Sequence, residues 1–223
     1  MADSVTLRLR EDSRRIWDRL LEHPFVVELY EGSLPLEKFR FYAVQDYNYL
    51  VGLVRSLSLA AAKMGPFDAS RLALEHAHFL ATTEMANYER LLTKLELSME
   101  EVLRAEPAPT NRAYADFMVA TCATGTLLQC LVALLPCYWS YRDIALHNRD
   151  RLERNKVELY RGWAQVYLSG DYGRAVEDYR RLIDTLYQRS PEDLDTLSNI
   201  FRTAARYEYM FWEMAYNMEK WPI

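Results

Sequence analysis

Two acidic residues, Asp46 and Glu208, lie at positions where a helix would bury them. The residues three and four positions from each acid are apolar or aromatic: Tyr42, Ala43, Tyr49 and Leu50 around Asp46, and Ala204, Ala205, Phe211 and Trp212 around Glu208. These offsets share one helix face, so each carboxyl group projects into apolar surface and must be hydrogen-bonded, ion-paired or kept protonated. Such a group serves either acid–base chemistry and substrate binding, or a structural contact with an arginine or a tyrosine hydroxyl.

Cys137 is a candidate nucleophile. It lies in the segment Leu-Leu-Pro-Cys-Tyr-Trp-Ser-Tyr, which ends at Tyr141 four residues later. No histidine is within helical reach, since His147 is ten residues away and on another face. If Cys137 is a nucleophile, a tyrosine hydroxyl, a carboxylate or the substrate must activate it. The alternative is a small side chain of the core, which is the commoner use of a free cysteine.

The segment 117–141 contains no Asp, Glu, Lys or Arg for 25 residues. Its length would permit a membrane span, which needs about 20 apolar residues. Polar or helix-breaking residues interrupt it: Thr121, Thr124, Gly125, Thr126, Gln129, Pro136 and Ser140. The chain has no second apolar segment of this length, and its first residues show no signal peptide. We therefore expect a cytoplasmic protein in which this segment is buried core or the lining of a site.

The elements that must position these residues are helices. Half of the 223 residues are hydrophobic, and only 7 Gly and 8 Pro are present, which favours long helices over a β-rich fold. We predict an all-α fold with a single domain over residues 1–223. Helical patterns run from about Ser4 to Leu21, from Ser33–Glu37 to about Met64, over Ala69–Leu95 and Met99–Arg104, and over 111–148, 156–168, 172–188 and 191–219, the last capped by Ser190 and Pro191.

Charge and cysteine content exclude some classes of partner. The net charge is −5 with no block of Lys or Arg, so a nucleic acid is not an expected partner. The three cysteines are Cys122, Cys130 and Cys137. If they share one helix, neighbours lie about 10–12 Å apart, which is too far for a disulfide bond. Reduced cysteines of this kind fit an intracellular protein.

Several segments together resemble the TenA family of aminopyrimidine hydrolases, also called thiaminase II. The matching blocks are His23-Pro-Phe, Gln45-Asp46-Tyr-Asn-Tyr49-Leu50, Pro109-Thr-Asn-Arg-Ala-Tyr114, Leu135-Pro136-Cys137-Tyr-Trp-Ser-Tyr141, Trp163 with Tyr167, and Glu208 with Phe211-Trp212. They follow the family order from about residue 15 to 218. One block alone would be a weak signal, whereas the ordered set is specific.

The resemblance implies a heme-oxygenase-like helical fold, a homotetramer, and no metal or other cofactor. It implies a small-molecule substrate, a 4-amino-2-methylpyrimidine or thiamin, whose C5-methylene substituent is replaced by hydroxyl in thiamin salvage. The family nucleophile falls on Cys137, the acid–base residue on Glu208, and the carboxylate that holds the exocyclic amine and the adjacent ring nitrogen on Asp46. The lining of the substrate site falls on Tyr49, Tyr114, Tyr141, Tyr167 and Phe211.

The residue types suit this reaction. A thiolate that adds to the ring carbon beside N1 breaks aromaticity and helps the C5 substituent to leave. A carboxylic acid at N1 stabilises the electron density that the addition pushes onto that nitrogen, which is the role for Glu208. Ionised Asp46 accepts a hydrogen bond from the 4-amino group, and aromatic side chains stack on the ring.

A shared pocket for Tyr114 and Cys137 requires a break in the charge-free segment. On one straight helix a separation of 23 positions would span about 35 Å. Gly125 suits a helix end, and Thr126 with Gln129 has the spacing of a capping box. We therefore predict a helix break at 123–126. Relatives tend to carry Glu at position 129, so Gln129 keeps the cap but loses its charge.

Two other functions stay open. A di-iron oxygenase on a similar scaffold needs Glu-x-x-His elements from more than one helix, and the sequence has one, Glu75 to His78. A regulatory or non-catalytic pyrimidine-binding protein would keep Asp46 and the aromatic residues, but it would not need Cys137 together with Glu208.

Overall fold

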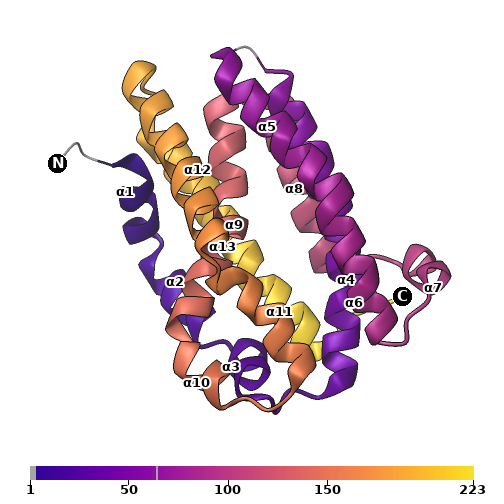
Figure 1. Ribbon diagram of the computed structural model, residues 1–223. Helices are drawn as coiled ribbons and strands as arrows, with labels where there is room; N and C mark the ends of the chain where they lie inside the picture. The colour runs from indigo at the N-terminus through magenta and orange to yellow at the C-terminus, as the bar shows by residue number, and fades with distance from the viewer. Residues whose placement is uncertain (1–3, 64) are drawn as a thin grey trace. The chain divides into compact units, whose positions relative to one another are not determined.

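Helices form all the regular secondary structure in the residues that the structure, a computed structural model, describes, which are 4–63 and 65–223 (Figure 1). The all-α prediction is therefore confirmed. The helices form two compact units. Unit 1 comprises residues 4–34 and 131–212, and unit 2 comprises 35–63, 65–130 and 213–223. The prediction of a single domain over residues 1–223 stays a prediction.

Unit 1 contains the short helices at the start of the chain and most of the helices in the second half of the chain. They are α1 (Val5–Asp12), α2 (Arg14–Leu21), α3 (Pro24–Glu31), α10 (Arg149–Arg154), α11 (Glu158–Leu168) and α12 (Gly170–Arg189), with most of α9 (Leu127–His147) and α13 (Leu194–Asn217). Aromatic side chains hold these helices together. Trp17 of α2 stacks on Phe201 of α13, with ring centroids 5.8 Å apart, and meets Trp139 of α9 edge-on at 5.6 Å.

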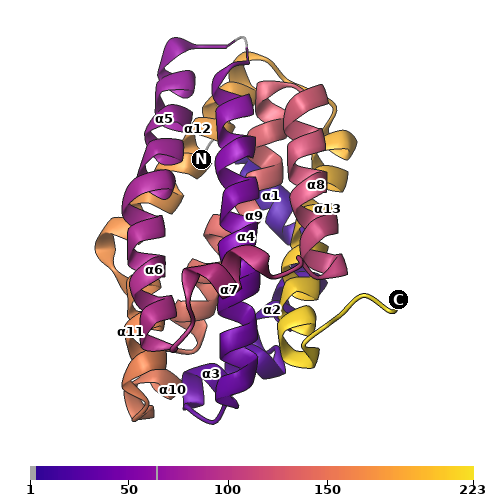
Figure 2. The same cartoon turned by 90° about the vertical axis from the view of Figure 1, so that its right-hand side faces the viewer.

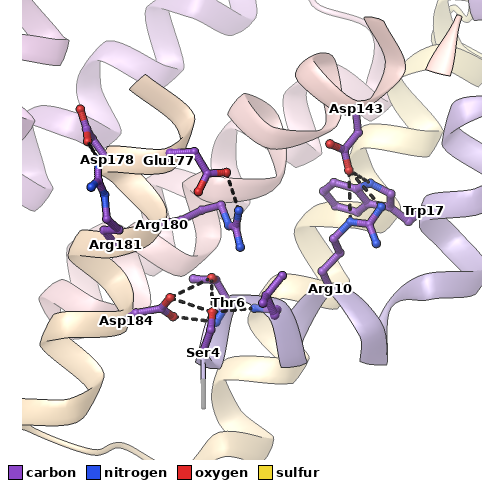
Figure 3. Close-up of polar contacts among 11 residues, drawn as sticks. Ser4, Thr6, Arg10, Trp17, Asp143, Glu177, Asp178, Arg180, Arg181 and Asp184 are labelled. Carbon is purple, nitrogen blue, oxygen red and sulfur yellow. Dashed lines mark hydrogen bonds and ion pairs between the residues drawn. The ribbon is translucent and has the colours of Figure 1, made fainter. Parts of the chain in front are cut away.

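Polar contacts fix α1 and α2 to their neighbours in unit 1 (Figure 3). On α12, Asp184 accepts hydrogen bonds from the Ser4 hydroxyl at 2.7 Å and the Thr6 amide at 2.9 Å, and so closes the first turn of α1. On α9, Asp143 accepts from the Arg10 guanidinium at 3.0 Å and from the Trp17 indole at 2.9 Å. The charged guanidinium and the indole N–H offset part of the cost of burying this carboxyl group.

Unit 2 is built around the long helix α4 (Leu36–Ala61), and α5, α6 and α8 all contact it (Figure 2). Its other helices are α5 (Phe67–Phe79), α6 (Met85–Lys94), α7 (Met99–Arg104) and α8 (Pro109–Thr124). A π-helical segment, Leu80–Glu84, joins α5 to α6. Gly52 lets α4 approach α8 closely, because a Cβ at that position would lie 3.1 Å from the Ala115 Cβ.

Gln45 ties the start of α8 to α4. Its amide oxygen accepts from the Ala108 amide at 2.8 Å and from the Asn111 side chain at 2.9 Å, and its amide nitrogen donates to the Glu106 carbonyl at 3.2 Å. Every polar atom of this buried side chain therefore has a partner, which offsets the cost of burying it. The contacts fix α8 beside the residue that precedes Asp46.

The predicted helix break is confirmed. Helix α8 ends at Thr124, α9 begins at Leu127, and Gly125 between them has an extended backbone. A side chain at Gly125 would meet the Thr121 carbonyl oxygen at 2.7 Å, so only glycine fits the turn without a shift. The Thr126 hydroxyl accepts from the Gln129 amide at 3.1 Å, and the Gln129 side chain accepts from the Thr126 amide at 3.3 Å. This is the predicted capping box.

Several predicted boundaries are wrong. The segment from Ser4 to Leu21 breaks at Ser13, and the sequence analysis missed α3 and α10. Helix α13 begins three residues later than predicted, because Asp193 and not Ser190 caps it by accepting from the Thr196 amide at 2.9 Å. Helix α4 ends at Ala61, and Met64, its predicted end, lies outside the described residues.

The cysteines do not share one helix, contrary to the premise used for their spacing. The turn between α8 and α9 brings Cys130 to Cys122, and the Cys130 thiol donates to the Cys122 carbonyl at 3.6 Å. All three cysteines are nevertheless free thiols. Across the described part of the chain, no helix combines the length and the apolar character that crossing a bilayer requires.

The capping box generates the first prediction. Replacing Thr126 with Ala removes the acceptor for the Gln129 amide, and we expect the free energy of unfolding to fall by about 0.5–2 kcal/mol in urea denaturation. The matched control is Thr124→Ala, because the exposed Thr124 hydroxyl only donates to the Ala120 carbonyl. Equal losses in the two variants would contradict a capping role for Thr126.

Candidate active site

The residues predicted to act on substrate fall into two groups, one in each unit. Unit 2 holds Asp46 and Tyr49 on α4 and Tyr114 on α8. Unit 1 holds Cys137 and Tyr141 on α9, Tyr167 on α11, and Glu208 and Phe211 on α13. The members of each group lie on the helices that the sequence patterns predicted for them, with the α8–α9 break between Tyr114 and Cys137.

Asp46 is buried inside unit 2, as the helix pattern predicted. Asp46 is 6% exposed. Its four neighbours on the helix face are buried with it: Tyr42, Ala43, Tyr49 and Leu50. The Tyr42 hydroxyl donates a hydrogen bond to Asp46 Oδ2 at 3.2 Å. A tyrosine hydroxyl is therefore one partner of the carboxyl group. Such a contact was the structural alternative to a functional role for Asp46.

Burial raises the pKa of Asp46 from its ordinary value of 3.8 to about 7. The nearby hydroxyls of Tyr88 and Tyr42 act in the opposite direction, and the charge of Glu84 raises the pKa further. Desolvation thus outweighs the two hydroxyl donors. At neutral pH the group is divided between a carboxylate, which only accepts hydrogen bonds, and a neutral acid, which also donates one.

Two tyrosines of unit 2 pack against each other, Tyr49 on α4 and Tyr114 on α8. Tyr49 lies one turn after Asp46, and its ring centroid is 5.1 Å from that of Tyr114. The Tyr49 hydroxyl donates to the Met118 sulfur at 3.5 Å. Both tyrosines are almost fully buried, so their rings form apolar surface in this part of unit 2.

The sequence analysis missed Glu84 and Tyr88, which both act on Asp46. Glu84 ends the π-helical segment and Tyr88 lies one turn later on α6. Burial raises the pKa of Glu84 as well. A π-helical turn often marks a functional position. The i, i+4 spacing of an acid and a tyrosine was a visible signal, but it resembled an ordinary solvated face.

Glu208 is buried inside unit 1, which confirms the second helix pattern. It is 3% exposed, and the neighbours on its helix face, Ala204, Ala205, Phe211 and Trp212, are buried. The Ser140 hydroxyl donates to Glu208 Oε2 at 3.4 Å. Ser140 lies on α9, three residues after Cys137, so this contact joins the helix of the candidate nucleophile to that of the candidate acid.

Cys137 differs from the other two cysteines in its exposure. It is half-buried, whereas Cys122 and Cys130 are fully buried. Pro136 lies inside α9 directly before it. Because proline lacks an N–H group and crowds the preceding turn, it weakens the helix at this point. A partly accessible thiol next to such a position suits a reactive cysteine better than a core cysteine.

Tyr141 is the centre of an aromatic cluster in unit 1. Its ring centroid lies 4.9 Å from Tyr167, 6.0 Å from Trp163 and 5.3 Å from Trp212. The Arg142 guanidinium donates to the Tyr167 carbonyl at 2.7 Å and so anchors the end of α11 to α9. The sequence analysis assigned Tyr141 and Tyr167 but not the two tryptophans that complete the cluster.

The described residues contain no cluster of side chains suited to bind a metal ion. Nowhere in 4–63 and 65–223 do three His, Cys, Asp or Glu side chains gather in an arrangement that could hold a metal ion.

The architecture first defines the class of fold. A domain from Shewanella denitrificans with a heme oxygenase-like fold matches with a TM-score of 0.76 at 15% identity, over 96% of this chain and 92% of that one. The heme-oxygenase-like fold prediction is confirmed.

The particular family follows from closer relatives. Residues 10–218 match the TENA/THI-4/PQQC family, and the chain belongs to it. It is similar to an aminopyrimidine aminohydrolase from Halalkalibacterium halodurans, with 31% identity over 98% of each chain. It is also similar to a TenA homologue protein from P. horikoshii OT3, with a TM-score of 0.92 and 44% identity over 96% of this chain and 99% of that one.

The raised pKa of Asp46 generates a prediction about stability. Between about pH 4 and pH 7 the unfolded chain has released this proton and the folded chain has kept it, so the free energy of unfolding falls as pH rises. Above about pH 7 both states are ionised and the contribution is constant. We expect Asp46→Asn to gain about 2–3 kcal/mol relative to the wild type between pH 5 and pH 8, measured by urea denaturation.

The control for this experiment is Asp150→Asn, because Asp150 is exposed on α10 and should leave the pH profile unchanged. Parallel profiles for the wild type and Asp46→Asn would mean that Asp46 titrates near its ordinary pKa in the folded protein.

Proposed function

We propose that this protein is an aminopyrimidine hydrolase of thiamin salvage. It would replace the C5-methylene substituent of a 4-amino-2-methylpyrimidine, or of thiamin, with hydroxyl to give 4-amino-5-hydroxymethyl-2-methylpyrimidine. The name of the Halalkalibacterium halodurans relative supports the reaction class. The observation that carries the proposal for this chain is the buried Asp46 with a pKa of about 7.

A carboxyl group with this pKa matches one edge of an aminopyrimidine. In the neutral form its O–H group donates to ring nitrogen N3, and its carbonyl oxygen accepts from the 4-amino group. Two hydrogen bonds made together orient the ring and exclude pyrimidines with a 4-oxo group, which reverse the donor pattern. The burial of Asp46 favours this neutral form over a carboxylate, which would leave N3 without a donor.

We assign the bond-making steps to Cys137 and Glu208. The Cys137 sulfur adds to the ring carbon next to N1, and Glu208 delivers the thiol's proton to N1. Electrons then return from N1 through the ring, the C5-methylene carbon becomes an exocyclic alkene carbon, and the substituent leaves. An amine substituent takes the N1 proton, whereas the thiazolium of thiamin leaves as a neutral thiazole and the N1 proton passes to Glu208. This addition divides one difficult displacement into easier steps.

The second half of the proposed reaction reverses the first. Water adds its oxygen to the methylene carbon, and its proton passes through Glu208 to N1. Loss of the Cys137 sulfur restores the aromatic ring, and the N1 proton returns to the thiol. Glu208 thus acts alternately as acid and base, a role that its burial and its contact with Ser140 support.

The family resemblance assigns the lining of the substrate site to five aromatic residues. Tyr49 and Tyr114 in unit 2, and Tyr141, Tyr167 and Phe211 in unit 1, offer apolar faces suited to a planar ring. The Gln129 cap is intact without a charge, so we assign it a structural role. Homotetrameric assembly, a cytoplasmic location and the absence of a cofactor stay predictions from the family resemblance.

The nucleophile and the acid can be tested together. We expect Cys137→Ser to lower kcat for 4-amino-5-aminomethyl-2-methylpyrimidine by about 10³-fold or more, and Glu208→Gln by about 10²–10⁴-fold. Binding of the hydroxymethylpyrimidine product, measured by calorimetry, should change much less. Cys130→Ser is the control, because Cys130 is buried and has no role in the proposed chemistry.

Undiminished turnover in Cys137→Ser would refute the nucleophile assignment. Product binding without turnover in the wild type would favour the non-catalytic pyrimidine-binding protein.

The protonation state of Asp46 gives a separate prediction. The amide of Asp46→Asn presents one donor and one acceptor, like the neutral acid, so KM should rise no more than about tenfold, whereas Asp46→Ala should raise it about a hundredfold or more. The wild-type KM should also increase above about pH 7, where the neutral form is lost, and the KM of Asp46→Asn should not. If Asp46→Asn fails as badly as Asp46→Ala, the bound form is instead the carboxylate with a pyrimidine protonated at N3.

A further inference from the structure

A hollow lies within unit 1, where α1 meets α2 and both meet α13. It encloses about 420 Å³ and is lined by residues 11–16 together with Arg202 and Arg206. This volume is within the range of small-molecule sites. Arg206 is exposed, whereas Glu208 two positions later on the same helix is buried, so the hollow is on a different face of α13 from the candidate acid.

The lining is positively charged although the chain as a whole is acidic. Four arginines, at positions 14, 15, 202 and 206, face two carboxylates at positions 11 and 12, which leaves a formal charge of +2 on a chain whose net charge is −5. Both acids already have partners, one outside the hollow and one inside it. Asp12 accepts from the Ser198 hydroxyl at 3.1 Å, and Glu11 lies 3.6 Å from Arg14.

Arg15 and Arg206 make no ion pair with any carboxylate in the described residues, and Arg202 donates to the neutral side chain of Asn199 at 3.2 Å. Arg202 and Arg206 are also four residues apart on α13, a spacing at which like charges repel and destabilise the helix. An anion between the arginines would convert this repulsion into attraction.

Ser13 provides an independent indication of a ligand. It is the N-cap of α2, an eight-residue helix, yet its side chain caps none of the helix amides. Ser13 is 2% exposed, it belongs to the lining of the hollow, and its hydroxyl has no hydrogen-bond partner in the described residues. A buried hydroxyl without a partner costs free energy, and a helix N-terminus attracts negative charge.

We propose that this hollow binds a small dianionic oxyanion, of the kind presented by a phosphate monoester or inorganic phosphate. A phosphate monoester carries a charge of about −1.5 to −2 at pH 7 and several strong acceptor oxygens, which matches the lining charge and the arginine donors. The Ser13 side chain, whose hydroxyl solvent does not reach in this structure, rotates into the hollow to donate to one oxygen, and the start of α2 adds its dipole. The site is separate from the proposed pyrimidine chemistry and does not rest on it.

The test is calorimetric titration of the full chain with inorganic phosphate at low ionic strength, where screening is weak. We expect saturable binding of one phosphate per chain. The double variant Arg15→Gln/Arg206→Gln should weaken it at least tenfold, and Ser13→Ala severalfold. Arg149→Gln is the matched control, since it removes a positive charge from exposed α10 and should leave the affinity unchanged. Circular dichroism verifies that each variant is folded.

A second arm distinguishes the sources of the phosphate group. Sedimentation with vesicles of phosphatidylcholine containing phosphatidic acid measures binding to lipid headgroups. Phosphate binding without sedimentation supports a soluble ligand, and both together support the same site with a lipid source. No saturable phosphate binding, binding that survives in Arg15→Gln/Arg206→Gln, or sedimentation without phosphate binding would overturn the proposal.

Discussion

The cost of burying a carboxyl group governs much of this structure. Asp46 lies among aromatic and aliphatic side chains of unit 2, where an isolated charge would be strongly unfavourable. Two tyrosine hydroxyls reduce this cost without removing it, and a second acid, Glu84, increases it. The outcome is a group balanced between its two protonation states near neutrality. More hydrogen-bond donors would stabilise the carboxylate form of Asp46, and without any donor the neutral acid would predominate.

This balance depends on how the helices of unit 2 hold their polar atoms. Gln45 satisfies three backbone and side-chain groups at the start of α8, so the residue beside Asp46 is immobilised. Tyr49 and Tyr114 then pack against each other from α4 and α8. In unit 1 the corresponding rigidity comes from aromatic contacts around Tyr141 and from the contact between Ser140 and Glu208. Rigid surroundings of this kind are what a site needs to hold a small planar substrate in one orientation.

Local patterns in the sequence were enough to predict the features that depend on neighbours along the chain. The faces of Asp46 and Glu208 follow from i±3 and i±4 spacing, and the break at Gly125 follows from capping chemistry at Thr126 and Gln129. Features that depend on tertiary contacts were missed. Helix α3 was missed although Pro24 in its first turn and the left-handed Gly32 at its end mark it locally, because it has only eight residues and is held by packing such as that of Phe25 on Trp212.

Tertiary contacts also explain why some residues near Asp46 and in the hollow were not predicted from the sequence. Glu84 and Tyr88 act on Asp46 from a different helix, and the arginines of the hollow come from both ends of the sequence of unit 1. Their spacing along the chain resembles that of solvated helix faces. Only the fold shows that Ser13, which the sequence pattern placed inside one continuous helix, begins α2 and has a buried hydroxyl without a partner.

The π-helical segment Leu80–Glu84 has an evolutionary consequence. A π turn contains one residue more than the α turn that it replaces, so a single inserted codon can create it inside an existing helix. Every residue that follows is rotated by about 100° around the helix axis relative to the uninterrupted helix. The position of Tyr88 near Asp46 therefore depends on the number of residues in this segment as well as on their identity. Homologues that lack the extra residue would need a different side chain to contact the same carboxyl group.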